Sequence, residues 1–247
     1  MICYHTGETE FPPGGIFLQD KPFISLAMLT RESLMDMIEV FKSFIDKADN
    51  INDIECIVGL DHDDFATISL FQSYQSRAWP NIKFKYEIFQ ERVGWEKLYK
   101  CWNKLYQKCE GEWIIFCSDD CSNITEKWDK IIKDKYKGKF VHIKTIVHPS
   151  ETTHPDPIAP VVCKKFLDIL GHVGLNTQFD KWLGDISRDL GFQVTDNDIE
   201  FYHVRTRNNV VNYEPCLNRY DNEDVPLREK DKEKVRQYLE TLKKEDK

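Results

Sequence analysis

The stretch Glu112-Trp113-Ile114-Ile115-Phe116-Cys117-Ser118-Asp119-Asp120 contains an uninterrupted apolar run that ends in two adjacent carboxylates. A run this short, rich in isoleucine and aromatic residues and introduced by Gly111, predicts a buried strand of a parallel sheet. Ligands of open α/β sheets gather at the carboxyl ends of such strands. Two aspartates there form a hard, anionic oxygen site, which suits Mg²⁺ or Mn²⁺ carrying a phosphorylated substrate.

The two aspartates also have a purely structural interpretation. A polar turn at Cys121-Ser122-Asn123 follows them, and a helix is predicted to begin near Ile124. Asp is favoured both at the start of turns and at helix N-caps, so Asp119 and Asp120 would then only begin the turn and cap that helix. The pair alone does not separate the two interpretations, and the rest of the chain favours the ligand site.

Length and composition set the class of protein. With 247 residues, 41% of them hydrophobic, the chain can bury a substantial core and is long enough for one large α/β domain or two small ones. Its net charge of −8 argues against a dedicated nucleic-acid binder, which usually has a basic face. No apolar run approaches the roughly 20 residues of a membrane span, and the polar N-terminus lacks the apolar core of a signal peptide. Eight cysteines, several of them in apolar segments, are typical of reduced core residues, so we expect a soluble cytoplasmic protein.

Strands and helices alternate through the first half of the chain. The predicted strands are residues 23–29, 54–60 and 82–89 and the apolar run between Gly111 and Asp119. Apolar residues at helical spacing predict helices at residues 34–49, 65–75 and 95–106. Right-handed crossovers would join these elements into a mostly parallel central sheet with helices on both faces, a single Rossmann-like α/β domain.

The second half continues the domain with a less regular pattern. We expect helices at 124–134, 164–170, 179–190 and 226–247, and strands at 140–147, 158–163 and 198–204. The predicted organisation is an N-terminal arm at 1–21, the α/β domain at 22–207, and a C-terminal tail with a charged helix at 208–247. Within the domain, 22–123 would form a nucleotide half and 124–207 an acceptor half.

The order of these motifs resembles a glycosyltransferase of the GT-A fold, closest to family 2. The resemblance covers residues 22–205 and is most specific from Gly94 to Asp120, where a glycine and a helix are followed by Gly111-Glu112-Trp113-Ile114-Ile115-Phe116 and the aspartate pair. It implies that Asp119 and Asp120 hold a divalent metal, Mn²⁺ or Mg²⁺, and that Asp119 also contacts the nucleotide sugar.

Further site residues follow from the same resemblance. Thr30, Arg31 and Asp61, at the ends of the first two strands, would lie where the family holds the nucleoside, and Gly94 would lie beside the nucleotide sugar. Asp63 and Asp64 follow closely, and either is also a natural N-cap for the next helix.

The second half contributes the remaining predicted site residues. The segment Phe179–Asp185 resembles the family's acidic motif, in which Asp185 would be the catalytic base. His203 would be a third metal ligand, and Arg205 would neutralise the diphosphate. Each has a structural alternative: Asp185 and Arg205 as solvated surface charges, and His203 as a hydrogen-bonded core residue.

Two departures from the family pattern affect the expected activity. Cys117 stands in place of the family's leading aspartate, so one nucleotide contact is lost or shifted. No Gln-x-x-Arg-Trp sequence follows Asp185, which argues against a processive polysaccharide synthase.

The resemblance therefore implies a metal-dependent, inverting and non-processive glycosyltransferase that uses a nucleotide-diphosphate sugar, a UDP-sugar first of all, with an unidentified acceptor. A catalytically inactive nucleotide- or sugar-binding domain is the first alternative. A sugar nucleotidyltransferase is the second, although Thr30-Arg31-Glu32 stands where its early glycine-rich loop would be.

Overall fold

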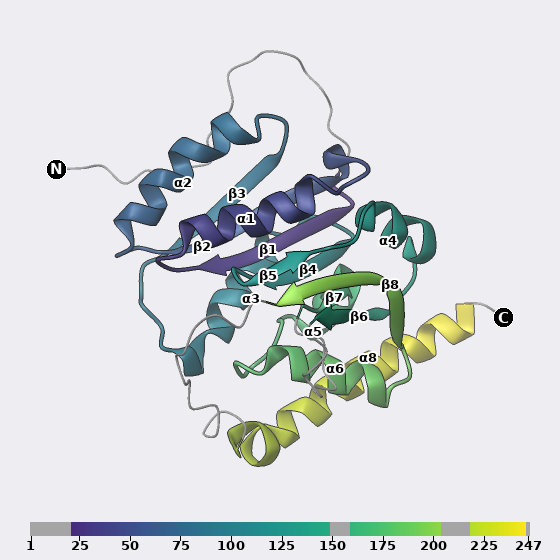
Figure 1. Cartoon of the computed structure of the whole chain (residues 1–247). Coiled ribbons are helices and arrows are strands. Elements are labelled where there is room, and N and C mark those ends of the chain that lie inside the picture. The colour runs from purple at the N-terminus through teal and green to yellow at the C-terminus, as the bar shows by residue number, and fades with distance from the viewer. Residues whose placement is uncertain (1–20, 149–158, 204–217, 246–247) are drawn as a thin grey trace.

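The computed structural model describes residues 21–148, 159–203 and 218–245, and it contains one sheet of eight strands (Figure 1). The strands are β1 (Ile24–Thr30), β2 (Ile54–Asp61), β3 (Lys83–Phe89), β4 (Trp113–Ser118), β5 (Cys121–Asn123), β6 (His142–His148), β7 (Val161–Cys163) and β8 (Gln193–His203). The α-helices are α1 (Leu34–Ile45), α2 (Phe65–Ala78), α3 (Tyr99–Lys108), α4 (Trp128–Tyr136), α5 (Lys164–Leu170), α6 (Phe179–Asp189) and α8 (Val225–Glu245). Three short helical turns complete the list: η1 (Ile51–Asp53), η2 (Trp95–Lys97) and η3 (Arg219–Glu223).

The order of the strands in the sheet is β3-β2-β1-β4-β7-β6-β8-β5. β1 pairs in parallel with β2 and β4, β2 pairs in parallel with β3, and β6 pairs in parallel with β8. β7 is antiparallel to both of its neighbours, and β5 is antiparallel to β8. The predicted fold class, a single α/β domain with a mostly parallel sheet, is confirmed.

Aromatic contacts hold the helices to the two faces of the sheet. On one face, Phe41 of α1 packs edge-on against Phe84 of β3, and the two ring centroids are 5.8 Å apart. On the other face, Phe116 of β4 contacts Trp102 of α3 at 5.5 Å and Phe179 of α6 at 5.7 Å. The predicted charged C-terminal helix is α8, which packs across α5 and α6 (Figure 1).

The buried strands supply the core. β1, β2 and β4 are buried along almost their whole length, as their continuous apolar sequences predict. Six cysteines of the described residues are free and buried, in agreement with the expected core role: Cys56, Cys101, Cys109, Cys117, Cys121 and Cys163. In the described part of the chain, no helix has the length and apolar character that crossing a membrane requires.

The segment after the aspartate pair differs from the prediction. Residues Cys121–Asn123 form strand β5 and not a turn, and α4 begins at Trp128 and not near Ile124. The Asn123 side chain explains the delay, because it accepts a hydrogen bond from the Thr125 backbone N–H at 3.0 Å and stabilises a turn there. Asp119 and Asp120 are therefore separated from the helix, and the N-cap interpretation of the pair is wrong.

Other boundaries differ by similar amounts. α1 ends at Ile45, four residues before the predicted end at Asp49, and β8 begins at Gln193, five residues before its predicted start. The predicted arm at 1–21 lies almost wholly outside the described residues, as does Arg205.

Candidate active site

The carboxyl ends of β1, β2 and β4 lie at one edge of the sheet, because the three strands are parallel and in register. This edge carries Thr30, Asp61 and the pair Asp119–Asp120, four of the residues that the sequence predicts for the site. β8 ends at the same edge with His203, since its pairing with β5 sets His203 opposite Cys121. Residues far apart in the sequence are thus collected where α/β sheets bind ligands.

The end of β1 contacts the first aspartate. The Thr30 hydroxyl donates a hydrogen bond to Asp119 Oδ2 at 3.1 Å, and Thr30 itself is buried. This contact spans the junction between β1 and β4 and fixes the direction of the Asp119 carboxylate. Two predicted nucleotide-sugar residues are therefore in direct contact.

The second aspartate contacts the predicted histidine. Asp120 Oδ2 lies 3.2 Å from His203 Nε2, and the Ser118 hydroxyl donates to the other Asp120 oxygen. Burial raises the pKa of Asp120, but hydrogen bonds from His203 and Ser118 outweigh it, so the pKa lies below its ordinary value. Asp120 is consequently an anion at neutral pH, and it lies against the imidazole of His203.

Arg31 and Asp61, both predicted near the nucleoside, form an ion pair. Arg31 Nη1 is 2.6 Å from Asp61 Oδ2 and 3.2 Å from Asp63 Oδ1. The hydrogen bond to Asp61, followed by the one to Asp63, raises the pKa of the guanidinium further above its already high value. Asp64 has the structural role that the sequence allowed, because it accepts hydrogen bonds from the backbone N–H groups of Glu32 at 2.7 Å and of Thr67 at 3.2 Å in the first turn of α2.

The Asp185 side chain has several partners away from this edge. Asp185 Oδ2 accepts a hydrogen bond from the Tyr220 hydroxyl at 2.5 Å and lies 3.1 Å from Lys181 Nζ, while Arg188 pairs with the other oxygen. Burial raises its pKa, but the hydrogen bonds from Tyr220 and Lys181 outweigh it and lower the pKa overall. Because its pKa is lowered and both of its oxygens have partners, the Asp185 carboxylate acts as a link between α6 and η3.

Asp180, five residues earlier in α6, lies nearer the carboxyl edge. Ser187, near the end of α6, contacts His142 at the start of β6 at 2.7 Å, whereas Phe179, its first residue, packs on Phe116 near the end of β4. α6 therefore runs antiparallel to these strands, and its first turn, with Asp180, approaches the end of β4. The pattern Phe179-Asp180 was available in the sequence, but only the direction of α6 distinguishes Asp180 from Asp185.

The metal prediction is tested by the arrangement of the donor atoms. Among the residues that the structure describes, no three His, Cys, Asp or Glu side chains are grouped so as to hold a metal ion. Asp120 and His203 are together, but Asp119 is turned to Thr30, so the three predicted ligands are not assembled as a set. Carboxylate oxygen and imidazole nitrogen still suit Mn²⁺ or Mg²⁺, and such ions take one or two protein ligands together with water and substrate phosphates. The Asp120–His203 pair fits that mode.

Gly94 forms the N-cap of η2 with φ −69° and ψ 167°, a conformation open to any residue. A Cβ atom at Gly94 would meet nothing within 4 Å, so the described residues do not require glycine there. Its predicted role beside the nucleotide sugar stays a prediction. So does the role of Arg205.

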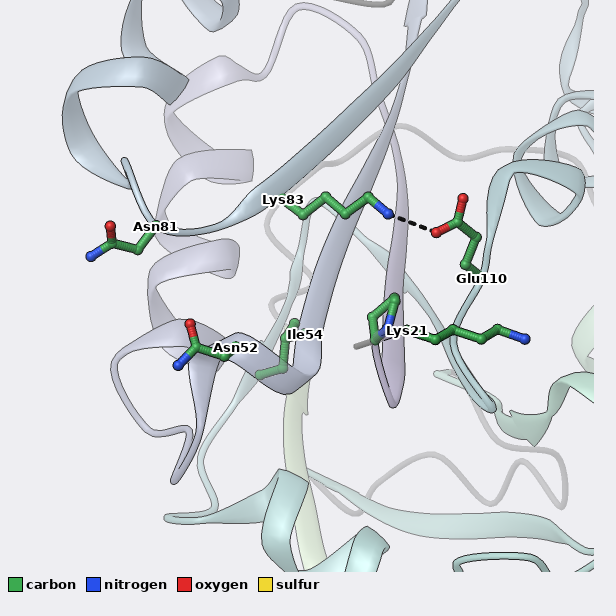
Figure 2. A pocket seen from close by; sticks show the side chains of 7 residues that line it. Lys21, Asn52, Ile54, Asn81, Lys83 and Glu110 are labelled. Atoms are coloured by element: carbon green, nitrogen blue, oxygen red, sulfur yellow. Dashed lines mark hydrogen bonds and ion pairs between the residues drawn. The ribbon is translucent and has the colours of Figure 1, made fainter. Parts of the chain in front are cut away.

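A cavity of about 320 Å³ lies at the opposite edge of the sheet, beside the amino ends of β2 and β3 (Figure 2). Figure 2 shows Lys83 and Glu110 joined across it by an ion pair, which has a distance of 2.6 Å. Its other lining residues are Lys21, Pro22, Asn52, Ile54 and Asn81. Because parallel sheets bind ligands at the carboxyl ends of their strands, this cavity is not the candidate active site.

Comparisons by sequence identify no relative. No protein-family model matches the chain, and a search of the curated proteins finds no match.

Solved structures do resemble the fold. The mannosyltransferase PcManGT from Pyrobaculum calidifontis, in complex with GDP-Man and Mn²⁺, matches with a TM-score of 0.63 and 13% identity, over 76% of this chain and 59% of that one. TarS from S. aureus (residues 1–349), in complex with UDP-GlcNAc, matches with a TM-score of 0.58 and 13% identity, over 74% of this chain and 59% of that one. The chain thus spans about three fifths of the length of these structures. The protein has an α/β fold of the GT-A glycosyltransferase type.

Proposed function

We propose that the protein transfers a sugar from a nucleotide-diphosphate sugar to an acceptor hydroxyl, with the help of a divalent cation. The observation that carries the proposal is the contact of Asp120 with His203, 3.2 Å apart, beside the Thr30–Asp119 hydrogen bond at the carboxyl edge of the sheet. The fold adds support, since one similar structure contains GDP-Man and Mn²⁺ and another contains UDP-GlcNAc.

Different residues of the site would bind different parts of the donor. Asp120 and His203 would hold the cation, which when bound supplies positive charge to the diphosphate leaving group. The Thr30 hydroxyl orients Asp119 toward the nucleotide sugar, and the Arg31–Asp61 pair offers donors and an acceptor to the nucleoside.

Transfer also needs a base for the acceptor. In the proposed reaction, the acceptor oxygen bonds to the anomeric carbon, the bond from that carbon to the diphosphate oxygen breaks with its electron pair, and the base takes the hydroxyl proton. Asp185 is the base that the family resemblance implies, with inversion at the anomeric carbon. Its engagement with Tyr220 and Lys181 makes Asp180, at the first turn of α6, the competing candidate.

A thermal-shift experiment with UDP and GDP, each with and without Mn²⁺, tests the proposal. A ligand that binds only the native state at 100 times its Kd stabilises the protein by about 2.7 kcal/mol. We expect a Mn²⁺-dependent rise in Tm with at least one nucleotide, lost in Asp120→Asn and kept in Asp134→Asn, an exposed carboxylate of α4. The absence of a shift with either nucleotide in the presence of Mn²⁺ would contradict the proposal.

A binding module without transfer activity is the second candidate, favoured by the three partners that engage Asp185. It would show the same thermal shift. Release of nucleoside diphosphate from UDP- or GDP-sugars separates the two, because only an enzyme turns the donor over.

A further inference from the structure

A second group of polar side chains lies at the carboxyl end of β6 and β8. His148 Nε2 is 2.8 Å from Glu200 Oε2, and the register of the parallel strands sets His148 beside Tyr202. These three residues are called the β6–β8 cluster below. None of them contributes to the proposed binding of the donor.

The β6–β8 cluster and the His203 side chain lie on opposite faces of the sheet. Successive side chains of a strand alternate between faces, so Tyr202 and His203 point in opposite directions. The face of His203 is turned toward α1, because Asn123, which shares it on β5, contacts the Ser43 backbone. The face of His148 is the one on which α6 packs, since His142, six residues earlier in β6, contacts Ser187. The β6–β8 cluster thus lies one residue from the proposed cation site, on the side of α6.

An irregularity in β8 produces this arrangement. Thr145 pairs with Asp196, but the next residue, Ile146, pairs with Glu200, so three residues of β8 bulge out between them. The backbone of Glu200 is then fixed, because its N–H donates to the Thr125 hydroxyl at 2.8 Å and its carbonyl accepts from the Ile124 N–H at 3.1 Å. Bulges beside active sites re-aim side chains, and this one brings Glu200 and Tyr202 level with the end of β6.

The side chains remain accessible in this position. Tyr202 is 45% exposed, near the end of the strand that lies next to the edge strand β5. The side chains of His148 and Glu200 are each 39% exposed. Their contact uses one ring nitrogen and one carboxylate oxygen, so each side chain has a second polar atom that this contact does not use.

We infer that the β6–β8 cluster is the acceptor subsite and that it binds a neutral carbohydrate. The electron-rich face of Tyr202 suits the C–H groups of a sugar ring, the Glu200 carboxylate accepts from sugar hydroxyls, and His148 offers a second polar contact. The negative charge of Glu200 disfavours a phosphate or carboxylate in the same place. The position of the first turn of α6, with Asp180, agrees with an acceptor hydroxyl that approaches the donor from this side. The inference rests on the proposed transfer reaction and specifies its second substrate.

Saturation-transfer NMR with methyl glycosides tests the inference directly. The ligands are the methyl glycosides of glucose, galactose, mannose and N-acetylglucosamine, each measured with UDP or GDP and Mn²⁺ present. We expect at least one glycoside to bind the wild-type protein and Tyr202→Ala to weaken its affinity about tenfold, which corresponds to about 1.4 kcal/mol. Tyr202→Phe keeps the ring and should bind within about twofold of wild type, whereas Glu200→Gln should bind more weakly.

The control variant is Leu70→Ala, which removes another exposed hydrophobic side chain, on α2, and should leave glycoside binding unchanged. Nucleotide binding is measured on every variant by thermal shift. If nucleotide binds but no glycoside does, or if Tyr202→Ala binds glycosides as well as wild type, the acceptor subsite is overturned while the proposed function stands. If no nucleotide binds the wild-type protein, the proposed function itself fails.

Discussion

At the scale of single residues, His203 is either a cation ligand or a core histidine. Its contact with Asp120 and its place at the end of β8 favour the ligand, and its side chain is 18% exposed, so some of it remains accessible. We predict that His203→Ala weakens Mn²⁺-dependent nucleotide binding at least tenfold while Tm falls by only a few degrees. Calorimetry and thermal unfolding of the same variant give both quantities. A large loss of stability with intact binding would assign His203 to the core.

Mutation can distinguish the two candidates for the catalytic base, Asp185 and Asp180. A general base contributes roughly 10²–10⁴-fold to rate and acts on the acceptor, so substituting it leaves donor affinity unchanged. We predict that Asp180→Asn or Asp185→Asn, but not both, lowers transfer by about that factor with normal donor binding. Slow hydrolysis of the donor serves as the assay until an acceptor is known.

The environment of Asp185 adds a second readout. If Asp185 only links α6 to η3, Asp185→Asn reduces stability by about 1–3 kcal/mol through weaker contacts with Tyr220 and Lys181, and the rate is ordinary. Full transfer activity in both variants would place the base elsewhere.

At the scale of elements, a buried carboxylate anchors α8 to the domain. Asp231 accepts a hydrogen bond from Trp182 Nε1 at 3.2 Å and lies 3.0 Å from His172 Nε2 and 2.8 Å from Lys234 Nζ. Burial raises its pKa, but the hydrogen bonds from His172 and Lys234 outweigh it, so the folded-state pKa lies below the unfolded value of about 3.9.

A carboxyl whose pKa is lowered by folding stabilises the protein above its unfolded pKa and ceases to do so as pH falls through the folded pKa. We therefore predict that Asp231→Asn loses about 1–3 kcal/mol at pH 7 and that its stability falls less steeply than that of wild type below about pH 4. Urea unfolding at a series of pH values measures both effects, and Glu240→Gln, on the exposed side of α8, is the control. Parallel pH curves for wild type and Asp231→Asn would contradict the anchor.

The entry to β4 depends on a glycine. A Cβ at Gly111 would lie 2.6 Å from the Ser25 backbone nitrogen and 2.8 Å from the Ile24 carbonyl carbon, where only backbone movement could make room. We predict that Gly111→Ala destabilises the protein by about 1–3 kcal/mol, and that Gly94→Ala does not, because a Cβ at Gly94 has open space. Equal urea midpoints for the two variants would contradict this.

The elements themselves were largely predictable, and the exceptions have a common cause. Strands β1, β2 and β4 are continuous apolar runs, and helices such as α1 and α6 have a clear apolar stripe, so local sequence was sufficient. Strand β5 has three residues and no apolar pattern, and it exists because residues about 80 positions later, at the end of β8, pair with it. The bulge of β8 is likewise a property of two strands and their register, which no local pattern contains.

At the scale of the whole molecule, the predicted nucleotide and acceptor halves share one sheet. The indole N–H of Trp128 donates to the Phe44 carbonyl at 2.8 Å, and the Asp129 carboxylate accepts from the backbone N–H groups of Asp49 and Asn50. We predict a single cooperative unfolding transition, with coincident urea curves from far-UV circular dichroism and tryptophan fluorescence. Two separated transitions would show that the halves are independent domains.

The sequence identifies the candidate site residues, but it does not predict how their side chains contact one another. Asp119 and Asp120 were recognisable from the apolar run that they end, whereas Thr30 and Asp61 were predicted from the family resemblance. All four follow strands whose carboxyl ends meet at a common edge. Which oxygen faces which neighbour depends on side-chain contacts between distant segments, so the turning of Asp119 to Thr30 and the partners of Asp185 appear only in the folded chain.

Chemical modification of the six buried cysteines would reveal when the folded protein opens. Burial raises the pKa of Cys121 to about 12 and that of Cys101 to about 11, so these thiols are both shielded and protonated at neutral pH. An alkylating reagent can then modify them only in molecules that have opened. Because Cys56 and Cys117 lie within β2 and β4, and Cys163 lies at the end of β7, mass spectrometry of the labelled peptides would show which strand separates first.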